Sequence, residues 1–428
     1  MSDTFCVHPW VNLEVYNTGT YDFCCIAKTS HLTGEDGEIL QVEKHTPKEA
    51  WNAKSLRQVR KDMLDGKKLD ICKNCWYQES IGKESYRKRH NNEWTHRLGK
   101  EEIQRRVRYS VDNDYYVDTP PDYLDLRLGS ICNLKCRMCN VWNSNQIEKE
   151  HLKLKTNNMY ADIWSRQYGR DVNITPLSND WLEAESFWEQ LHEYIPTLKK
   201  VYFTGGEPTL VESNYSFMEE MIDQGFQNKI DLFFNTNCTN VQPRWLETLS
   251  KFKNVQINAS IDGVGPVNDY IRAPSNWSAI YKNFMAMASL DNVRLDISPV
   301  IQTYNILDIG NILNLAQETS HKTGKIVDVD FLLCNSPFHL DPLNLDDNVR
   351  TTAFLKLQKW QDSWIYKKSP ITKNSIDSYL TLLESERNIK WKQNMEDFWN
   401  MTSIHDKNRN QSFEKSIPEL YGLLNGNN

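Results

Sequence analysis

The sequence has no apolar run long enough to span a membrane, and its first residues lack the basic and apolar segments of a signal peptide. It also lacks an excess of positive charge. The net charge of −7 gives no overall signal for binding nucleic acid or another polyanion. We therefore expect a cytoplasmic protein with no membrane contact and no nucleic-acid partner. Disulfides are rare in a reducing compartment, so the ten cysteines indicate metal binding instead.

The length of 428 residues favours two or three domains, and a hydrophobic content of 39% is sufficient for extended cores. The cysteines are unevenly distributed along this chain. Five lie before residue 80, three form a short triplet, and Cys238 and Cys334 stand alone. The triplet and the N-terminal group are therefore the two candidate metal sites.

The triplet consists of Cys132, Cys136 and Cys139, and it directly follows an alternating stretch that is typical of a strand. A 4Fe-4S cluster held by three cysteines keeps one iron free for an exogenous ligand. Zinc sites instead pair two CxxC-type units. The spacing would also place three buried thiols on one helical face, but the Gly129-Ser130 break and the charges between the cysteines favour a loop.

Strands and helices alternate after a boundary at Asp118-Thr119-Pro120-Pro121. This alternation predicts an α/β fold with a parallel sheet, right-handed crossovers and chemistry at the carboxyl ends of the strands. After the strand that enters the triplet, strands are expected over Leu198–Thr204, Ile230–Thr236, Val255–Ile261, Val293–Val300 and Ile326–Leu333. The last ninety residues predict helices, such as Phe354–Trp364 and Ile376–Arg387, and no chemistry.

The N-terminal cysteines form a second group. A strand after Cys6 and the turn Asn17-Thr18-Gly19 predict a hairpin that brings Cys6 near the Cys24-Cys25 pair. A CxxC motif, Cys72 and Cys75, follows a predicted helix. Four thiolates from these segments would fill either a zinc site or a closed 4Fe-4S cluster, and the residues alone leave both open. We take Cys24 as the ligand and Cys25 as the spare.

The stretch from Lys83 to Arg108 is basic. Such a run is typical of a solvated linker helix, and a docking surface for an acidic partner or leader segment is the alternative.

The triplet resembles the signature of the radical S-adenosylmethionine (radical SAM) superfamily. In that family the amino and carboxylate groups of S-adenosylmethionine chelate the free iron, and the residue before the third cysteine rests against the adenine. Met138 stands there, and a thioether can lie on a ring face. The resemblance implies an open six-stranded (β/α)6 partial barrel and an enzyme that cleaves S-adenosylmethionine reductively to a 5′-deoxyadenosyl radical. It also implies an electron donor such as flavodoxin or ferredoxin.

The same resemblance assigns residues at the ends of the later strands. Gly205-Gly206-Glu207-Pro208 matches the motif that binds the amino group of the cofactor. Ordinary turn chemistry also explains the next strand ends. In the family, however, the positions of Asn235, Thr236, Asn237, Ser260, Asp262 and Gly263 contact the ribose and carboxylate, Arg272 pairs with the carboxylate, and Val300, Gln302 and Asn305 lie near the adenine. Cys334 would close the sixth strand and could quench a substrate radical, whereas Cys238 is expected to be structural.

The N-terminal cysteines resemble the SPASM or twitch modules that accompany radical SAM enzymes, although those modules usually follow the catalytic domain. This resemblance favours an auxiliary 4Fe-4S cluster over zinc, and a peptide or protein side chain as substrate. A small molecule or nucleoside precursor is the alternative substrate, and a zinc-binding interaction protein is the alternative of another class. The expected domains are an auxiliary module (1–82), a basic linker (83–118), the radical SAM core (119–336) and a helical extension (337–428).

Overall fold

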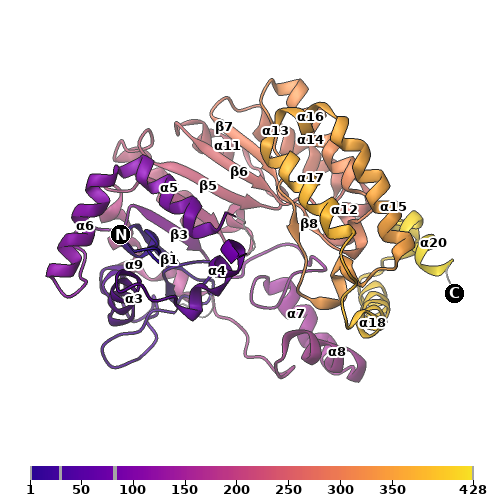
Figure 1. Ribbon diagram of the computed structural model, residues 1–428, viewed down its shortest axis with the longest axis horizontal. Coiled ribbons are helices and arrows are strands. Elements are labelled where there is room, and N and C mark those ends of the chain that lie inside the picture. The colour runs from indigo at the N-terminus through magenta and orange to yellow at the C-terminus, as the bar shows by residue number, and fades with distance from the viewer. Residues whose placement is uncertain (1, 28–30, 81–83, 427–428) are drawn as a thin grey trace. The chain divides into compact units, whose positions relative to one another are not determined.

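The structure is a computed structural model that describes residues 2–27, 31–80 and 84–426 (Figure 1). The chain divides into two compact units. The first comprises residues 1–130, 178–233 and 251–254, and the second comprises residues 131–177, 234–250 and 255–428. In the described part of the chain, no helix is both long and apolar enough to cross a membrane. The predicted boundaries at 82, 118 and 336 do not coincide with this division and stay a prediction.

The first unit contains four strands in the order β2-β1-β3-β4. They are β1 (Asn12–Val15), β2 (Tyr21–Asp22), β3 (Tyr123–Arg127) and β4 (Lys200–Thr204). The predicted N-terminal hairpin is confirmed, because β1 and β2 pair antiparallel. In addition, β1 pairs parallel with β3, and β3 pairs parallel with β4. The N-terminal hairpin is therefore continuous with the strand that enters the triplet, a pairing that the sequence analysis did not predict.

Alternation along these strands separates two kinds of side chain. Leu124 and Leu126 of β3, with Val201 and Phe203 of β4, are fully buried on one face. The opposite face carries polar residues, and Asp125 of β3 is paired in register with Glu14 of β1 and with Tyr202 of β4. Because successive side chains of a strand point to opposite faces, the apolar positions fix which side of the sheet the helices cover.

Eleven helical segments complete the described part of the first unit, including α5 and α6, which occupy much of the predicted linker. Thr46 forms a capping box with Glu49 at the start of α2, and Ser85 caps α5. The segments are α1 (His8–Val11), α2 (Pro47–Trp51), α3 (Lys54–Leu64), η1 (Asp70–Cys72), α4 (Lys73–Ser80), α5 (Tyr86–Leu98), α6 (Lys100–Asp112), η2 (Asp180–Glu183), α9 (Glu185–Tyr194), η3 (Pro208–Leu210) and α10 (Glu212–Asp223).

Arginines of the basic stretch form ion pairs within this unit. The Arg87 guanidinium lies 2.7 Å from a Glu79 carboxylate oxygen, and Arg97 lies 2.7 Å from Asp231. Arg106 is paired with the buried Asp122. These charges are already satisfied by acidic partners, so they favour the structural interpretation of the stretch over a docking surface.

The second unit contains the later strands. β5 (Asp231–Thr236) runs along the chain from the first unit into the second, where β6 (Val255–Ala259) pairs parallel with β7 (Val293–Ile297). These strands correspond to those predicted. The predicted sixth strand is reduced to β9 (Leu332–Leu333), which pairs with β8 (Val300–Ile301), and to one bridge between Ile297 and Val329. Leu332 and Leu333 are exposed, so no core contact extends this strand.

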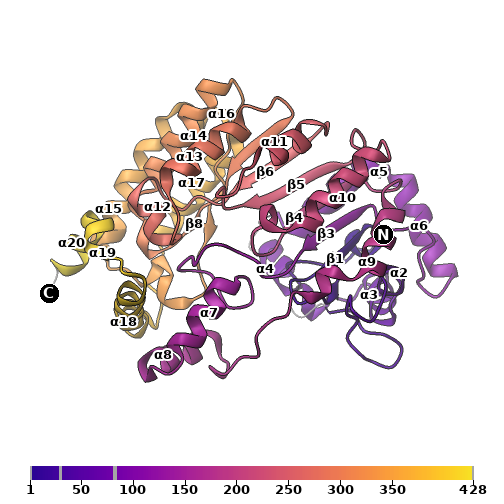
Figure 2. The same ribbon diagram turned by 180° about the vertical axis from the view of Figure 1, so that it is seen from behind.

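Helices make up most of the rest of the second unit, including the predicted helical extension. Figures 1 and 2 show α13, α14, α16 and α17 side by side. The helices and short 3-10 turns are α7 (Asn145–Leu154), α8 (Asn158–Tyr168), α11 (Pro243–Ser250), α12 (Pro266–Ile271), α13 (Trp277–Ala288), η4 (Thr303–Asn305), α14 (Ile309–Thr323), η5 (Phe338–Leu340), η6 (Pro342–Asn344), α15 (Asp347–Gln358), η7 (Lys359–Asp362), α16 (Trp364–Lys368), α17 (Pro370–Leu383), α18 (Trp391–Arg409), α19 (Phe413–Ser416) and α20 (Pro418–Asn425).

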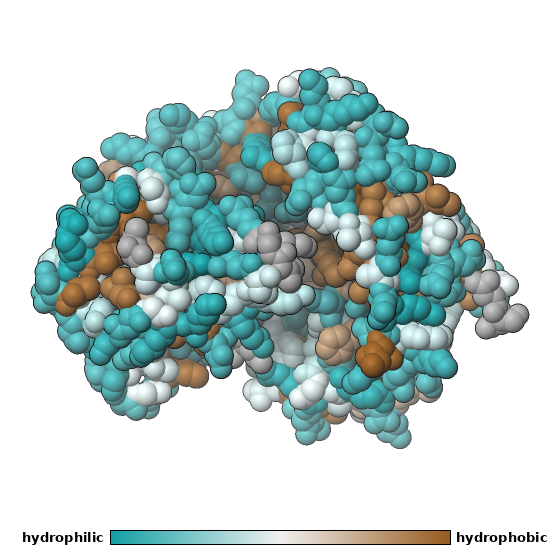
Figure 3. All heavy atoms as spheres, viewed as in Figure 1, coloured by the Kyte–Doolittle hydropathy of each residue, from teal (hydrophilic) through white to brown (hydrophobic). Residues whose placement is uncertain are grey.

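The surface of these C-terminal helices is mainly hydrophilic on the face drawn in Figure 3, with small apolar patches. Leu355 of α15 and Ile371 of α17 are among the exposed large apolar residues. Single exposed apolar residues of this kind are normal on a protein surface.

Candidate active site

The three triplet cysteines lie on one partly exposed loop of the second unit, as the sequence predicted. The loop is held by backbone hydrogen bonds: Lys135 N–H donates to the Ala273 carbonyl, and Arg137 N–H donates to the Ile271 carbonyl. The Arg272 guanidinium donates to Cys136 Sγ at 3.7 Å. Charge-assisted hydrogen bonds of this kind stabilise a thiolate, which is the form that binds metal.

The thiols of this loop influence one another. Burial raises the pKa of Cys136, and Arg272 opposes this shift. The pKa of Cys139 is also raised, first by burial and then by the nearby Cys136 and Cys132. Two neighbouring thiols that resist ionisation are an arrangement that a cationic metal group stabilises, because a metal ion favours the deprotonated ligand.

The spacing of the triplet argues against one zinc ion. Sulfurs around a tetrahedral zinc lie about 3.8 Å apart. Among the described residues, the one group of potential ligands whose atoms all lie within 4.8 Å of one another does not include the triplet. A wider spacing suits the larger 4Fe-4S cluster, whose thiolates bind different irons.

Residues of the C-terminal extension hold the triplet loop, which the sequence analysis did not predict. The buried Arg137 stacks on Tyr270, with its guanidinium carbon 3.8 Å from the ring centroid. It also forms an ion pair with Asp406 of α18 and donates to Gln411 Oε1 at 3.2 Å. Arginine in a buried, stacked and hydrogen-bonded environment is fixed in position, so α18 and the residues after it stabilise the loop.

Several predicted residues at the strand ends form one hydrogen-bond network. Asp262 is fully buried, and its carboxylate lies 2.7 Å from Arg272 Nε and accepts from Val300 N–H at 2.8 Å. The Asn305 amide donates to the Asp262 and Val300 carbonyls, and its Oδ1 accepts from Gln302 N–H. Arg272 thus joins Asp262 to Cys136, and its predicted contact with a cofactor carboxylate stays a proposal.

The other predicted strand ends have local partners. Asn235 Oδ1 accepts from Asn258 at 3.0 Å, and the Thr236 carbonyl accepts from Ser260 N–H at 2.8 Å. Met138 is partly exposed beside the third cysteine. These positions satisfy turn geometry, and no contact in the structure tests their predicted roles with the cofactor.

The Gly205-Gly206-Glu207-Pro208 motif belongs to the first unit. Gly205 has a φ of +117°, and a Cβ there would lie 3.0 Å from the Gly129 carbonyl oxygen. Glycine is therefore needed for close packing against the backbone at the end of β3. The buried Glu207 accepts from the Thr209 hydroxyl at 2.7 Å and from its N–H at 3.2 Å, so its carboxylate is held in place.

Cys334 is buried, and its thiol donates to the Ser336 carbonyl at 3.6 Å. Burial raises its pKa to about 12. Both Cys334 and Cys139 raise the pKa of Tyr168, after the larger effect of burial, so this tyrosine lies near both thiols. Cys238, predicted to be structural, is fully buried with its thiol donating to the Thr236 carbonyl. The predicted reaction of Cys334 with a radical is untested.

The N-terminal cysteines also come together. Burial raises the pKa of Cys6 to about 12, and Cys72 and Cys75 add to this shift. Cys6 in turn raises the pKa of Cys24, after the larger effects of its bond to Cys25 and of burial. Cys25 differs, because its thiol donates to the Tyr86 hydroxyl at 3.4 Å. Cys6 therefore lies near Cys24, Cys72 and Cys75, but Cys25 also raises the pKa of Cys75, so the choice of Cys24 over Cys25 stays a prediction.

A buried acidic pair beside Cys25 was not predicted. Glu14 and Asp125 are partners in register, and their carboxylates lie with the Cys25 thiol within 4.8 Å of one another. Arg127 Nε is 2.8 Å from Glu14 and compensates part of this charge. The pKa of Glu14 is raised, mainly by burial and then by Asp125. Only the alternation within β1 and β3 could have indicated that these residues share a face.

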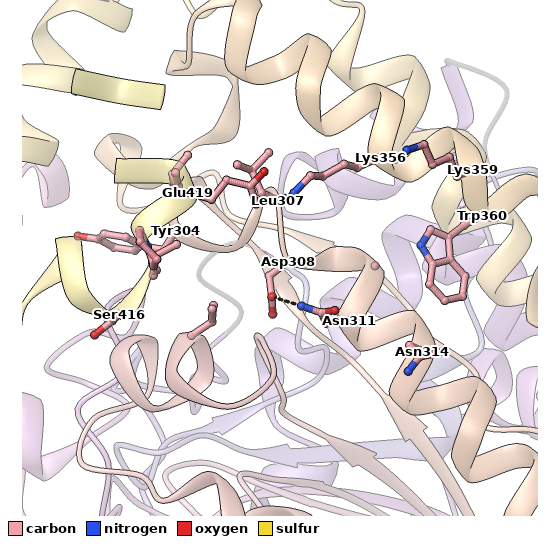
Figure 4. Close-up of a pocket in the computed structure, with 15 residues that line it drawn as sticks. Tyr304, Leu307, Asp308, Asn311, Asn314, Lys356, Lys359, Trp360, Ser416 and Glu419 are labelled. Atoms are coloured by element: carbon pink, nitrogen blue, oxygen red, sulfur yellow. Dashed lines mark hydrogen bonds and ion pairs between the residues drawn. The ribbon is translucent and has the colours of Figure 1, made fainter. Parts of the chain in front are cut away.

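A cavity of about 530 Å3 elsewhere in the second unit contains none of the predicted residues. Figure 4 shows Asp308 and Asn311 pointing toward each other on one side, with Lys356 and Trp360 on another. Burial raises the pKa of Asp308 to about 6. Tyr304 lines this cavity and also lies 5.1 Å from the Arg137 guanidinium, so it separates the cavity from the triplet loop.

One family model and several solved structures are similar to parts of this chain. Residues 126–316 match the family model described as the radical SAM superfamily. A search of curated proteins found no match. Native anSMEcpe with bound AdoMet and a Kp18Cys peptide is 19% identical, with a TM-score of 0.35 over 57% of this chain and 62% of that chain. SuiB of Streptococcus suis bound to its precursor peptide SuiA is 12% identical, with a TM-score of 0.36 over 74% and 61%. The chain thus covers less than two thirds of these proteins.

The residues present fit the cluster that this family implies. Three cysteines share one loop, Arg272 donates to one of their sulfurs, and the triplet is not the described group whose ligand atoms all lie within 4.8 Å of one another. The match begins inside β3 and includes the triplet, the Gly-Gly-Glu-Pro motif and the Asp262 network. The family match supports an enzyme, and it covers residues 126–316, less than half of the chain.

Proposed function

We propose that Cys132, Cys136 and Cys139 hold a catalytic 4Fe-4S cluster with which the enzyme cleaves S-adenosylmethionine. When bound, such a cluster supplies the electron that breaks a carbon–sulfur bond of S-adenosylmethionine and yields a 5′-deoxyadenosyl radical. The observation that carries this proposal is the single loop of three cysteines with Arg272 bonded to Cys136. The family match over these residues supports it.

The chain's own residues would bind and orient the cofactor. Glu207 is a buried carboxylate already fixed by Thr209, so it could accept from the amino group without losing further side-chain freedom. Asp262 and Arg272 form a buried ion pair that holds the end of the fourth predicted strand beside Cys136. This preorganisation keeps the polar groups in place and excludes water.

A peptide or protein side chain is the proposed substrate. The support is the second cysteine group, in which Cys6 lies near Cys24, Cys72 and Cys75, together with its resemblance to SPASM or twitch modules. We propose an auxiliary 4Fe-4S cluster there, since these sulfurs also lie outside the one described group with zinc-like spacing. A small molecule or nucleoside precursor is the alternative substrate. An electron donor such as flavodoxin or ferredoxin, and a cytoplasmic location, complete the proposal.

The test is reductive cleavage by anaerobically reconstituted protein. Wild-type enzyme with dithionite and S-adenosylmethionine should produce 5′-deoxyadenosine, measured by liquid chromatography with mass spectrometry. Replacing all three triplet cysteines by Ala should abolish the product, because no cluster remains to transfer the electron, while the metal of the N-terminal group is retained. Unchanged cleavage in the triple variant would refute the assignment.

A further inference from the structure

A small void next to the triplet loop contains a buried donor from the C-terminal extension. The void measures about 30 Å3, and Cys136, Cys139, His339, His405 and Arg409 are among its lining residues. All of these residues belong to the second unit. The void therefore gives side chains far along the chain direct access to the two cysteines.

Arg409, the last residue of α18, binds Glu150 through two of its three guanidinium nitrogens. Its Nε and Nη2 donate to the two carboxylate oxygens of Glu150 at 2.9 and 2.5 Å. Its side chain is 2% exposed, and within the part of the chain that the structure describes, the buried Nη1 has no hydrogen-bond partner. Because the guanidinium is planar, binding Glu150 through Nε and Nη2 directs Nη1 away from that carboxylate.

An unpaired buried cationic donor is costly, so it indicates a group that completes the site. A charged donor that is buried loses its hydrogen bonds to water, and without a protein partner no new hydrogen bond compensates for this loss. Arg409 lines the same void as Cys136 and Cys139. A second buried polar atom without a partner in the described chain, His339 Nδ1, belongs to a residue of the same wall.

We propose that Arg409 donates a hydrogen bond to the catalytic cluster, through a cysteine sulfur or a bridging sulfide, and thereby raises the reduction potential of that cluster. Potentials of iron–sulfur clusters depend on net charge and on hydrogen bonds to the sulfurs. A cluster that gains an electron becomes more negative, so a nearby cationic donor stabilises the reduced state more than the oxidised one. This inference rests on the proposed function of the triplet.

The test is an EPR-monitored redox titration of the full-length reconstituted enzyme, in which dithionite adds one electron to the cluster. The signal under study is the one that disappears when the three triplet cysteines are replaced by Ala. In Arg409→Gln the ratio of reduced to oxidised cluster at a fixed potential should fall about tenfold, which is a 59 mV decrease for one electron. Glu150→Gln removes the carboxylate that neutralises Arg409, so the same ratio should rise.

Two variants with opposite expected signs separate this role from a merely structural one. A destabilised loop would not move the potential up in one variant and down in the other. Arg166→Gln is the matched control, since Arg166 pairs with Asp397 of the same helix α18 but is 48% exposed and does not line the void. The reduction potential of the cluster in Arg166→Gln should equal that of the wild type.

The outcomes are distinguishable from failure of the proposed function. Wild-type protein without a triplet-dependent signal would overturn the proposed function itself. An intact cluster with an unchanged potential in Arg409→Gln, as expected if only water fills the void, would overturn the role of Arg409 alone. If Arg409→Gln does not retain iron, the cluster potential of Glu150→Gln tests the proposal instead. An unchanged or lowered potential in Glu150→Gln refutes the proposal.

Discussion

The ion pair between Arg137 and Asp406 should control how often the triplet loop opens. The Arg137 side chain is 1% exposed and Asp406 is 16% exposed. Removing one partner from a buried pair costs about 3 to 5 kcal/mol. Because Arg137 would keep Gln411 and its stacking on Tyr270, we expect Asp406→Ala to cost about 3 kcal/mol, the lower end of that range. At about 1.4 kcal/mol per factor of ten, this is roughly a hundredfold.

Hydrogen exchange measured by mass spectrometry can detect this change. The amides of Lys135, Arg137 and Cys139 are hydrogen-bonded within or beside the loop, so they report its local opening. Their exchange should be roughly a hundredfold faster in Asp406→Ala. Lys356→Ala is the control, because its ion pair is solvent-exposed and such pairs contribute about 0.2 to 1 kcal/mol. Exchange within threefold of wild type in Asp406→Ala would refute the reasoning.

Three further predictions concern the first unit. Glu207→Ala should weaken binding of S-adenosylmethionine more than tenfold in calorimetry, because a lost buried carboxylate–ammonium contact costs about 2 to 5 kcal/mol. Glu207→Gln, which keeps an acceptor for Thr209, should also bind weakly. Wild-type affinity in these variants would contradict the role of Glu207 in binding the amino group. Protein with the triplet replaced by Ala should retain about four irons and no zinc after reconstitution, whereas stoichiometric zinc without iron–sulfur absorption would exclude an auxiliary cluster. The hydrogen bond that His31 donates to the Asp22 carboxylate raises the pKa of His31 above 6.5. The stabilisation by this pair is therefore complete below pH 6.5 and is lost as the pH rises through the raised value; a urea midpoint whose decrease over this range is the same in His31→Gln would contradict this.

The sequence predicted best the features that depend on neighbouring residues. Period-two alternation located β3 to β7, because alternate residues of each of these strands are apolar and buried. The triplet spacing identified a loop with three cysteines, and the N-terminal hairpin was correctly expected to bring Cys6 near Cys24. These predictions succeed because the signal and the structure it encodes lie within a few residues of each other.

Features that join distant segments were not predicted. Alternation identifies a strand but not its partner, so the parallel pairing of β1 with β3 and the buried Glu14–Asp125 pair were missed. The expected strand over Ile326–Leu333 failed for the opposite reason. Its apolar residues suggested burial, but Leu332 and Leu333 are exposed and only a two-residue ladder forms.

The same limitation explains why the C-terminal extension seemed to carry no chemistry. Arg137 and Asp406 are 269 residues apart, and charged residues on a helix normally indicate a solvated face. Here Asp406 and Arg409 lie one turn apart at the end of α18, so a single helical face supplies both the partner of Arg137 and the donor beside Cys136. The family match ends at residue 316, before this helix begins. A cluster loop that depends on α18 for its ion pairs therefore cannot be understood from the matched domain alone, and removing the extension should expose Arg137 and release Glu150 from Arg409.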